Sequence, residues 1–321
     1  MAKGFRTMTA PGDAQLAPLV VVLLATYNGE AYLEEQLASI LEQEGVTVRL
    51  VVSDDSSIDG TRGILDEAAR DPRVTVLEPG RFGTPQGNFL RLVREADLDG
   101  AAAVAFADQD DVWHRDKLAR QLALLERLGA DAVSSNVIAF WQRDDGSRRT
   151  ELIDKAQPQV ALDFLLESAG PGCTFVFGVD AFLTVRAALT KVPDDGMVPH
   201  DWLAYAVVRA TGGRWHIDET PTLDYRQHDA NATGANSGLT QAATRFRRLA
   251  SGEYRAQCGA VAHLAAAVAD DAQRARLERI APLFDRTDFG SRMALRRLSP
   301  ELRRETTERR LLRAALLLGV W

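Results

Sequence analysis

Apolar residues in the first half of the chain follow two alternating spacings. Continuous apolar runs, rich in Val, Leu or Ala, predict strands buried on both faces at 19–25, 46–53, 74–79 and 101–107. The segments between them carry apolar residues at helical spacing, at 31–43, 62–71, 89–96 and 117–128. A fifth strand is predicted over 131–141. Strands separated by helices of this length predict βαβ units and a mostly parallel sheet.

The second half of the chain has a less regular pattern. ESAGPGCTFVFG (167–178) predicts a Gly-rich turn that leads into a short strand, and VPHDWLAYAVVRATGG (198–213) predicts a helix. TPTLDYRQHDANATGANSG (220–238) begins as a strand and ends as a polar loop. From Leu239 onward the pattern is helical in several segments.

Polar side chains gather directly after three of the predicted strands. TYNGE (26–30) follows the first strand, DDSS (54–57) the second and DQDD (108–111) the fourth. Ligands of parallel sheets bind outside the carboxyl ends of the strands, so these loops predict a binding edge. TYNGE offers one glycine where a dinucleotide fingerprint needs three, and no phosphate loop ending in GK[ST] is present. A metal ion on carboxylates is another common way to hold a diphosphate.

The stretch ADQDDVW (107–113) places three carboxylates within four residues. Packed carboxylates repel one another, and their desolvation is costly unless a positive charge lies between them. The motif therefore predicts either a solvated acidic turn or a site for a divalent metal ion, and short acidic turns are common on surfaces. Taken alone, the motif leaves both interpretations open.

Composition narrows the class of protein. With 321 residues, 46% hydrophobic and 26% charged, the chain is typical of a soluble globular protein, and its net charge of −7 argues against nucleic-acid binding. Two cysteines exclude a disulfide framework and favour a reducing compartment. The N-terminus lacks the apolar core of a signal peptide, and no apolar run is long enough to cross a bilayer, so we expect a cytoplasmic protein.

The tail has a charge of its own. From residue 241 onward it carries sixteen arginines against nine acidic residues. A basic, Leu-rich helical end can lie on the anionic inner face of a membrane or pack on the core as a solvated bundle, and we favour the bundle.

Several motifs together carry a resemblance. LLATYNGEAYLEEQLASILEQ, VVSDDSSIDGT, NFLRLV, FADQDDVWHRDKL, GPGCTFVF, PHDW and YRQHDANATGA occur in this order. In this order and spacing the chain resembles family 2 glycosyltransferases of the GT-A fold, most closely the bacterial rhamnosyltransferase-like branch. The resemblance covers roughly residues 19–236. One departure is that Ser56 replaces the glycine of the usual DDGS, which leaves the backbone of that turn less free.

The resemblance implies a fold and a domain organisation. The fold is α/β, a GT-A fold with a Rossmann-like, mostly parallel sheet flanked by helices and a C-terminal helical extension. The expected parts are a flexible arm (1–18), a GT-A domain (19–238) with a nucleotide-binding half (19–141) and an acceptor-binding half (142–238), and a helical C-terminal region (239–321).

It also implies an activity, cofactors and partners. The expected reaction is the inverting, metal-dependent transfer of a sugar, L-rhamnose ahead of others, from dTDP-rhamnose or a UDP-sugar. The acceptor would be a hydroxyl of a cell-surface glycan or a lipid-linked molecule, and the cofactor Mg²⁺ or Mn²⁺. The nucleotide residues it implies are Thr26, Tyr27, Asp55, Asn88 and Asp108, the metal residues Asp110 and His228, the catalytic base Asp201, and the acceptor-side residues Gly172, Cys173, His200 and Trp202.

The chemistry of these residue types agrees with that reaction. A divalent ion on carboxylates stabilises a leaving diphosphate, and a carboxylate can take the proton of an attacking hydroxyl. Asp201 could instead cap the helix that follows it, and a helix N-terminus would tend to lower its pKa. Other functions stay open: transfer to a small natural product, a sugar-nucleotide pyrophosphorylase, or a binding module that has lost catalysis.

Overall fold

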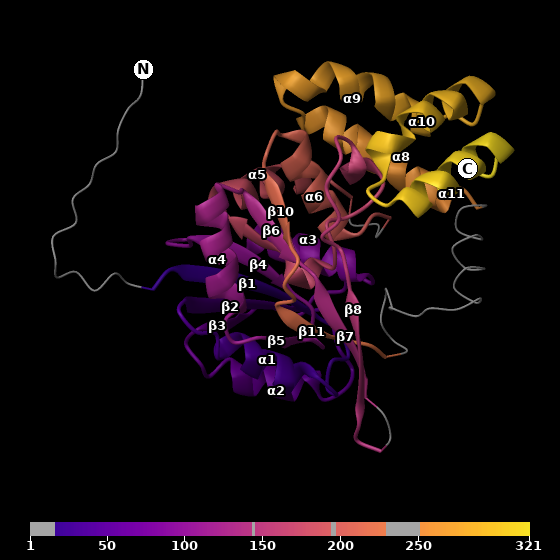
Figure 1. The fold of residues 1–321 in the computed structure, drawn as a ribbon. Helices are drawn as coiled ribbons and strands as arrows, with labels where there is room; N and C mark the ends of the chain where they lie inside the picture. Colours follow the sequence, from indigo (N-terminus) through magenta and orange to yellow (C-terminus); the bar gives the residue numbers. More distant parts are fainter. Residues whose placement is uncertain (1–16, 143–144, 194–196, 229–250) are drawn as a thin grey trace, which may run out of the picture.

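The apolar runs of the sequence form a mixed sheet that helices cover on both faces (Figure 1). The computed structural model of the chain describes residues 17–142, 145–193, 197–228 and 251–321. The strands are β1 (Leu19–Thr26), β2 (Thr47–Asp54), β3 (Val74–Val76), β4 (Ala103–Ala107), β5 (Val112–Trp113), β6 (Ala132–Ser135), β7 (Val137–Gln142), β8 (Arg148–Ile153), β9 (Val176–Gly178), β10 (Trp215–Asp218) and β11 (Leu223–Arg226). The helices are α1 (Leu33–Leu41), α2 (Thr61–Ala68), α3 (Pro85–Glu95), α4 (Lys117–Leu128), α5 (Val179–Leu189), α6 (His200–Ala210), α8 (Glu253–Val268), α9 (Asp271–Phe284), α10 (Phe289–Leu302) and α11 (Thr306–Leu318), with short 3₁₀ turns η1 (Asp163–Leu165) and η2 (Gly172–Thr174).

Strand β1 explains why the sheet needs continuous apolar runs. Its residues Val20, Val22 and Leu24 pack into one apolar cluster with α1, α2 and α4. Its residues Val21 and Leu23 pack into a second cluster with α3, α5 and α6. Successive side chains of a strand point to opposite faces, so a strand covered on both sides has no place for polar residues.

The main sheet brings the predicted binding edge together. Its seven strands have the order β10-β6-β9-β4-β1-β2-β3. Strand β1 pairs in parallel with both β2 and β4, while β9 runs antiparallel between β4 and β6. The carboxyl ends of β1, β2 and β4 therefore lie side by side, and the mostly parallel α/β sheet predicted from the alternation is confirmed.

A second sheet of four strands, in the order β5-β11-β7-β8, stands beside the first. The predicted single strand 131–141 is wrong in one respect: it is divided at Asn136 into β6 of the main sheet and β7 of the second. The buried Asn136 side chain donates to the carbonyl of Glu219 at 3.0 Å and accepts from the amide of Lys155 at 2.6 Å. A strand can therefore leave one sheet and enter the other without a loop.

Other predicted elements differ in extent. Helix α3 begins at Pro85, four residues before the predicted start, because Thr84 caps it by accepting from the amide of Gly87 at 3.1 Å. Strand β8, whose sequence RRTELI is almost wholly exposed, and strand β10 were not predicted, and neither was helix α5.

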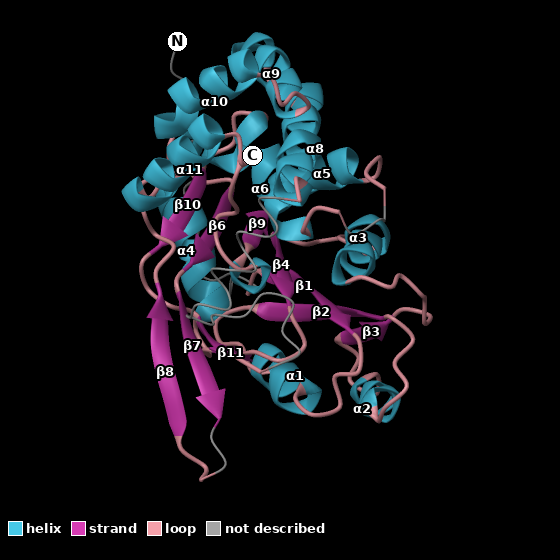
Figure 2. Cartoon of the chain, turned by 90° about the vertical axis from the view of Figure 1, so that its right-hand side faces the viewer, coloured by secondary structure: helices cyan, strands magenta, loops and turns pink. Residues whose placement is uncertain are grey.

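Helices α8 to α11 stack over one end of the molecule, opposite α1 and α2 (Figure 2). Their apolar residues, among them Val261, Ile280 and Leu316, join the cluster that covers α6. The inner face of these helices therefore packs on the core, as the bundle interpretation of the tail predicts. Within the described ranges, none of the helices combines the length and the apolarity needed to span a bilayer. Residues 1–16 of the predicted arm and 229–250, at the predicted start of the tail, lie outside the described residues.

Candidate active site

The loops after β1 and β4 are joined by one glutamine. Thr26 donates its hydroxyl to the Gln109 side-chain oxygen at 2.6 Å, and the amide of Tyr27 donates to the same oxygen at 2.9 Å. The Gln109 amide group returns a hydrogen bond to the carbonyl of Tyr27 at 3.1 Å. The Tyr27 ring is 52% exposed beside this junction, so it is available to a ligand.

Asp55 follows β2 and holds the neighbouring Gly-rich loop. Its two carboxylate oxygens accept from the backbone amides of Phe82 and Gly83, at 2.5 and 2.9 Å. Next to it, Ser56 has φ of +56°, the left-handed region that favours glycine. The turn thus keeps the glycine conformation without the glycine, and the Ser56 hydroxyl donates to the carbonyl of Gly80 at 2.6 Å.

Asn88 lies in the first turn of α3 and is buried. Its amide group donates to the carbonyls of Thr26 and Ser53, at 3.1 and 3.0 Å. Both donors are therefore used to join the ends of β1 and β2. We expect Asn88 to shape the nucleotide side of the site through the backbone.

The structure brings Asp110 and His228 together across 118 residues of sequence. The His228 Nε2 atom lies 2.7 Å from Asp110 Oδ2. Arg226 fixes this arrangement, because its Nε donates to the carbonyl of Asp110 at 2.8 Å and its backbone amide donates to Asp111 at 3.2 Å. The Arg226 guanidinium also pairs with Glu35 of α1.

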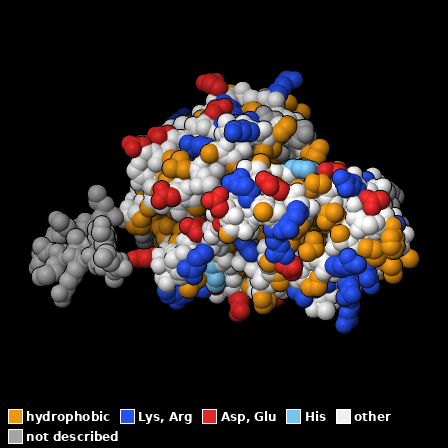
Figure 3. Space-filling model, turned by 90° about the horizontal axis from the view of Figure 1, so that it is seen from above, with side chains coloured by type: hydrophobic (Ala, Val, Ile, Leu, Met, Phe, Trp, Pro, Cys, Tyr) orange, Lys and Arg blue, Asp and Glu red, His pale blue; other side chains and the backbone are white. Residues whose placement is uncertain are grey.

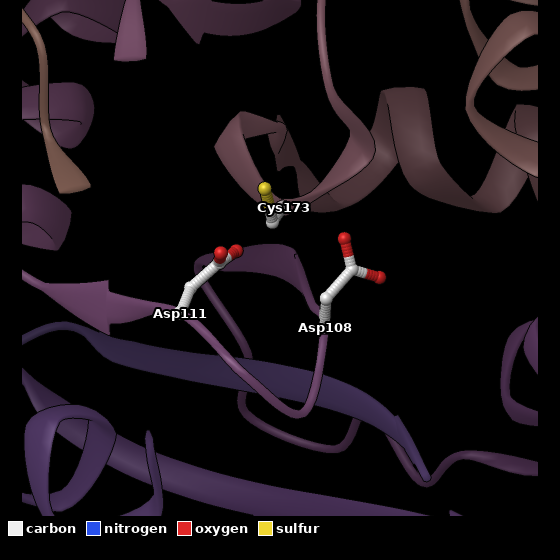
Figure 4. Close-up of side chains that lie close together, drawn as sticks. All are labelled: Asp108, Asp111 and Cys173. Atoms are coloured by element: carbon white, nitrogen blue, oxygen red, sulfur yellow. The ribbon is translucent and has the colours of Figure 1, made fainter. Parts of the chain in front are cut away.

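The other two acids of the loop face Cys173. Carboxylate oxygens of Asp108 and Asp111 and the Cys173 sulfur all lie within 4.8 Å of one another. Figure 4 shows both carboxylates rising from the loop after β4 toward the segment that carries the thiol. Burial, together with the charges of Asp110 and Asp201, raises the pKa of Asp108 to about 7. Burial likewise raises the pKa of the Cys173 thiol, which is therefore protonated at neutral pH.

A buried lysine lies beneath this acidic group. The Lys117 ammonium donates to Gln121 at 2.6 Å and lies 4.4 Å from the centre of the Trp113 ring. Burial lowers the pKa of Lys117 to about 7, while the charge of Asp111 works in the opposite direction. Lys117 therefore lies within electrostatic reach of Asp111, on the side of the loop that is closed to solvent.

Asp201 lies in the first turn of α6, next to η2. Its carboxylate accepts from the amide of Trp202 at 2.6 Å, and Ser168 and the backbone of Gly172 also act to lower its pKa. The expected lowering of its pKa is wrong, because burial raises the pKa of Asp201 to about 6 in spite of these hydrogen bonds. Helix α6 begins at His200, one residue before Asp201, and Pro199 occupies the N-cap position, so Asp201 is not the N-cap residue. The helix dipole is thus outweighed by desolvation.

Two residues predicted on the acceptor side lie in the core. The His200 ring stacks on Phe89 with centroids 3.6 Å apart, and burial lowers its pKa to about 3. Trp202 is 6% exposed and donates its indole N–H to the carbonyl of Phe164 at 2.8 Å. These positions do not support direct acceptor contact by either ring. Gly172 is buried too, and a Cβ there would lie 2.9 Å from the His200 ring, so a glycine is required for this close approach.

Sequence reasoning missed Gln109, Arg226 and Ser168. Gln109 and Arg226 lie within the motifs DQDDVW and YRQH, whose spacing is the sequence signal for them. The partner of the Arg226 guanidinium is 191 residues away in sequence, and no local pattern indicates it.

The donor set fits a divalent metal ion. The loop offers carboxylates together with an imidazole, which suit Mg²⁺ or Mn²⁺. In addition, Asp111 Oδ2 is buried and has no hydrogen-bond partner among the described residues. Three acids packed this closely repel one another when ionised, and burial together with this repulsion raises the pKa of Asp108 and Asp111, so a cation between them would relieve the repulsion.

Known proteins resemble the chain in sequence and in fold. The family model for glycosyl transferase family 2 matches residues 21–185. The dTDP-rhamnosyl transferase RfbG of Shigella flexneri is 37% identical over 253 residues, covering 77% of this chain and 85% of RfbG. The UDP-Glc:alpha-D-GlcNAc-diphosphoundecaprenol beta-1,3-glucosyltransferase WfgD of Escherichia coli is 26% identical over 162 residues, covering 49% of this chain and 59% of WfgD. The crystal structure of S. aureus TarS 1-349 in complex with UDP-GlcNAc matches with a TM-score of 0.56 and 15% identity, covering 94% of this chain and 81% of TarS 1-349, a likeness of fold.

The fold, the acidic loop at the sheet edge and these similarities define an enzyme that transfers a sugar from a nucleotide sugar. The chain belongs to glycosyl transferase family 2. The predicted GT-A fold and the resemblance to the rhamnosyltransferase-like branch are confirmed.

Proposed function

We propose that the chain is an inverting, metal-dependent glycosyltransferase that moves L-rhamnose from dTDP-rhamnose to a hydroxyl of a cell-surface glycan or lipid-linked acceptor. The contact of 2.7 Å between Asp110 and His228 carries the proposal, since it joins the acidic loop to a residue 118 positions away. The identity to RfbG, whose name specifies a dTDP-rhamnosyl donor, supports the choice of sugar nucleotide.

The nucleotide lies at the carboxyl ends of β1 and β2 in this proposal. The exposed Tyr27 ring packs on the base, and Thr26 and Asn88 hold the backbone beneath it. Asp55 accepts from N3–H of the pyrimidine on the lone pairs that Phe82 and Gly83 leave unused. Asp108 faces the ribose.

Asp110 and His228 hold the metal ion in this proposal. When bound, a divalent ion neutralises the charge that develops on the leaving diphosphate. Arg226 keeps Asp110 in place through its carbonyl, and Lys117 lies within electrostatic reach of Asp111. The loop therefore presents its charge toward the sugar nucleotide.

Asp201 acts as the general base. With its pKa near 6 it is ionised at neutral pH and still basic enough to accept a proton from the acceptor hydroxyl. A Cβ added at Gly172 would lie 3.1 Å from the Cβ of Asp201, and the next residue, Cys173, faces Asp108, so Asp201 lies close to the donor side of the site. Inversion follows when the hydroxyl attacks from the face opposite the nucleotide.

The donor can be tested by thermal stabilisation with Mn²⁺. We expect dTDP and dTDP-rhamnose to raise the melting temperature more than UDP or GDP, by about 5 °C at a hundredfold excess over Kd. The base contact at Asp55 explains the expected preference over GDP, because guanine does not present the same donor at the same depth, and the similarity to RfbG supports the preference over UDP. Calorimetry in which GDP binds more tightly than both dTDP and UDP contradicts the proposal.

The C-terminal helices contact the inner face of the membrane in this proposal. Of the large apolar side chains that are exposed, Phe289, Leu311, Leu317 and Leu318 lie on α10 and α11. Arg292 connects the two helices, since its guanidinium lies 5.9 Å from the Phe289 ring and donates to the carbonyl of Leu316 at 3.2 Å. Seen from above, basic and apolar side chains are intermixed at this end of the molecule (Figure 3). The name of WfgD specifies a diphosphoundecaprenol acceptor, and a lipid acceptor of that kind would require such a surface.

Vesicle co-sedimentation tests this contact. We expect binding to be roughly 100-fold stronger with phosphatidylglycerol than with phosphatidylcholine alone, because each of a few arginines near the surface contributes about 1 kcal/mol. Leu317→Ser with Leu318→Ser should remove the binding, whereas Leu152→Ser with Leu183→Ser, exposed leucines on β8 and α5, should not. Equal recovery of the protein with both kinds of vesicle, or undiminished binding at high salt, contradicts the proposed membrane contact.

A further inference from the structure

We infer that the C-terminal helices complete the active site, with Arg304 as a positioning residue that holds the Glu167–Ser168 segment against Asp201. This inference rests on the proposed role of Asp201 as the base. Arg304 lies between α10 and α11, outside residues 21–185 that the family model matches.

Arg304 makes several hydrogen bonds to the Glu167–Ser168 segment. Its backbone amide donates to the Glu167 carboxylate at 2.8 Å, and its guanidinium donates to the same carboxylate at 3.2 Å. The guanidinium also donates to the carbonyl of Ser168 at 2.5 Å and to that of Lys155 at 3.3 Å. The Arg304 side chain is 2% exposed, so these contacts are made away from solvent.

The segment that Arg304 holds reaches the base directly. The Ser168 hydroxyl donates to the carbonyl of Gly170 at 3.2 Å, and a Cβ added at Gly172 would lie 3.1 Å from the Cβ of Asp201, so this turn packs directly against the base. Ser168 and the backbone of Gly172 also act to lower the pKa of Asp201, against the effect of burial. Arg304 thus fixes the carbonyl of Ser168, and the turn that follows Ser168 packs against one side of Asp201. Asp201 itself makes no contact with the C-terminal helices in this chain of bonds.

Helix α8 holds the same region from a second direction. The Tyr254 hydroxyl donates to the carbonyl of Leu166, and its ring stacks on Trp202, next to Asp201, with centroids 5.9 Å apart. Gln257 donates to the carbonyl of Met197 at 2.6 Å, just before α6. Both chain segments that flank Asp201 are therefore held by residues beyond position 250.

The chemistry of Arg304 favours a positioning role over a simple gain in stability. A buried arginine with carboxylate partners gives little net stability compared with apolar packing, because desolvation offsets the attraction. Its planar fork does fix geometry, since several donors point in set directions. Here those directions lead to the Glu167 carboxylate and the Ser168 carbonyl of this segment and to the carbonyl of Lys155, while the Asp163 carboxylate lies 3.7 Å away.

The first test compares Arg304→Gln with a matched control, Arg276→Gln. Arg276 pairs with Glu301 at 2.6 Å on the partly exposed side of the same helices and does not touch the loop. We measure dTDP release from dTDP-L-rhamnose with Mn²⁺, and dTDP affinity by calorimetry. We expect Arg304→Gln to lower kcat roughly 10–100-fold with dTDP Kd within twofold of wild type, since small misplacements of a reacting group have effects of this size.

Arg276→Gln should stay within twofold of wild type in both measurements. Hydrogen exchange adds a readout that needs no substrate: amides of 162–170 should exchange faster in Arg304→Gln than in Arg276→Gln. Equal exchange and equal kcat in the two variants overturn the inference. If Arg304→Gln does not fold, Ser168→Ala replaces it, with the same expected loss of kcat and the same unchanged affinity.

A double variant separates this inference from the proposed function. If Arg304 acts through Asp201, adding Arg304→Gln to Asp201→Asn should lower kcat by less than threefold beyond Asp201→Asn alone. A loss as large as in the wild-type background shows that Arg304 acts elsewhere and overturns the inference. Wild-type turnover in Asp201→Asn overturns the proposed base, and the exchange comparison still decides whether Arg304 holds the loop.

Discussion

Asp110→Asn is expected to lower sugar transfer by at least about 100-fold without unfolding the protein. Asparagine keeps the shape of aspartate and can still bond to His228, which lies 2.7 Å away, but it lacks the charge that binds a divalent ion. Loss of an outer partner of a metal ligand already costs 10–100-fold, and loss of a ligand costs more. The check is the rate of nucleotide release from the donor as a function of Mn²⁺ concentration.

The same substitution at Asp116 provides the control, because this exposed residue precedes α4 and makes no capping bond through its side chain. Without metal, Asp110→Asn should melt no lower than wild type, since the charge of Asp110 raises the pKa of both Asp108 and Asp111 through repulsion. EDTA should abolish wild-type activity, and Mn²⁺ should restore it. Full activity after EDTA treatment would exclude the metal from the reaction.

Asp201→Asn is the second large effect, with an expected loss of roughly 10²–10⁴ in turnover. An amide cannot accept the proton of the acceptor hydroxyl, but it can still accept the hydrogen bond from the amide of Trp202. The melting temperature and the dTDP affinity should therefore stay close to wild type. Steady-state turnover, calorimetry and thermal unfolding together check the three parts of this expectation.

Asp180→Asn is a matched control, because Asp180 is the second residue of α5 as Asp201 is of α6, and it is exposed. The pH profile gives a further check on Asp201. Burial raises its pKa to about 6, and the base must be ionised, so turnover should rise as pH increases through 6 and level off above it. Turnover of Asp201→Asn within a few-fold of wild type would mean that another group is the base.

The strands of the nucleotide side could be predicted because burial on both faces requires a continuous apolar run, which can be recognised in the local sequence. Every residue from Val20 to Leu24 is apolar, and each packs into one of two clusters. The division of the strand at Asn136 has no such pattern in the local sequence. Its reason is the set of bonds from the Asn136 side chain to Glu219, 83 residues later in sequence, and to Lys155. Strand β8 escaped prediction because its exposed, charged residues resemble those of a loop.

Some positions in the site could likewise be predicted from the local sequence, and others depend on residues distant in sequence. Tyr27, Asp108 and Asp110 could be placed at strand ends from the sequence, because polar residues directly after buried strands are noticeable, whereas His228 followed from the resemblance; their roles stay predictions. The position of His200 could not be predicted, because the rings that bury it, Phe89 and Phe106, lie on other elements. The pKa of Asp201 was expected in the wrong direction for a related reason. Its place on a helix can be read locally, but its burial depends on segments distant in sequence.

The division of one strand between two sheets at Asn136 has a consequence for the exchange of segments between relatives. A residue inserted or deleted between Ala132 and Gln142 would change the pairing register in the main sheet, in the second sheet or in both, and a shift by one turns each side chain to the opposite face. A crossover placed inside this stretch would therefore join incompatible halves. A crossover in the segment between α4 and β6 would instead transfer β7, β8 and β11 of the second sheet, Asp201, Arg226 and His228 as one inherited unit, with the C-terminal helices that support it, and would leave only β5 with the other parent.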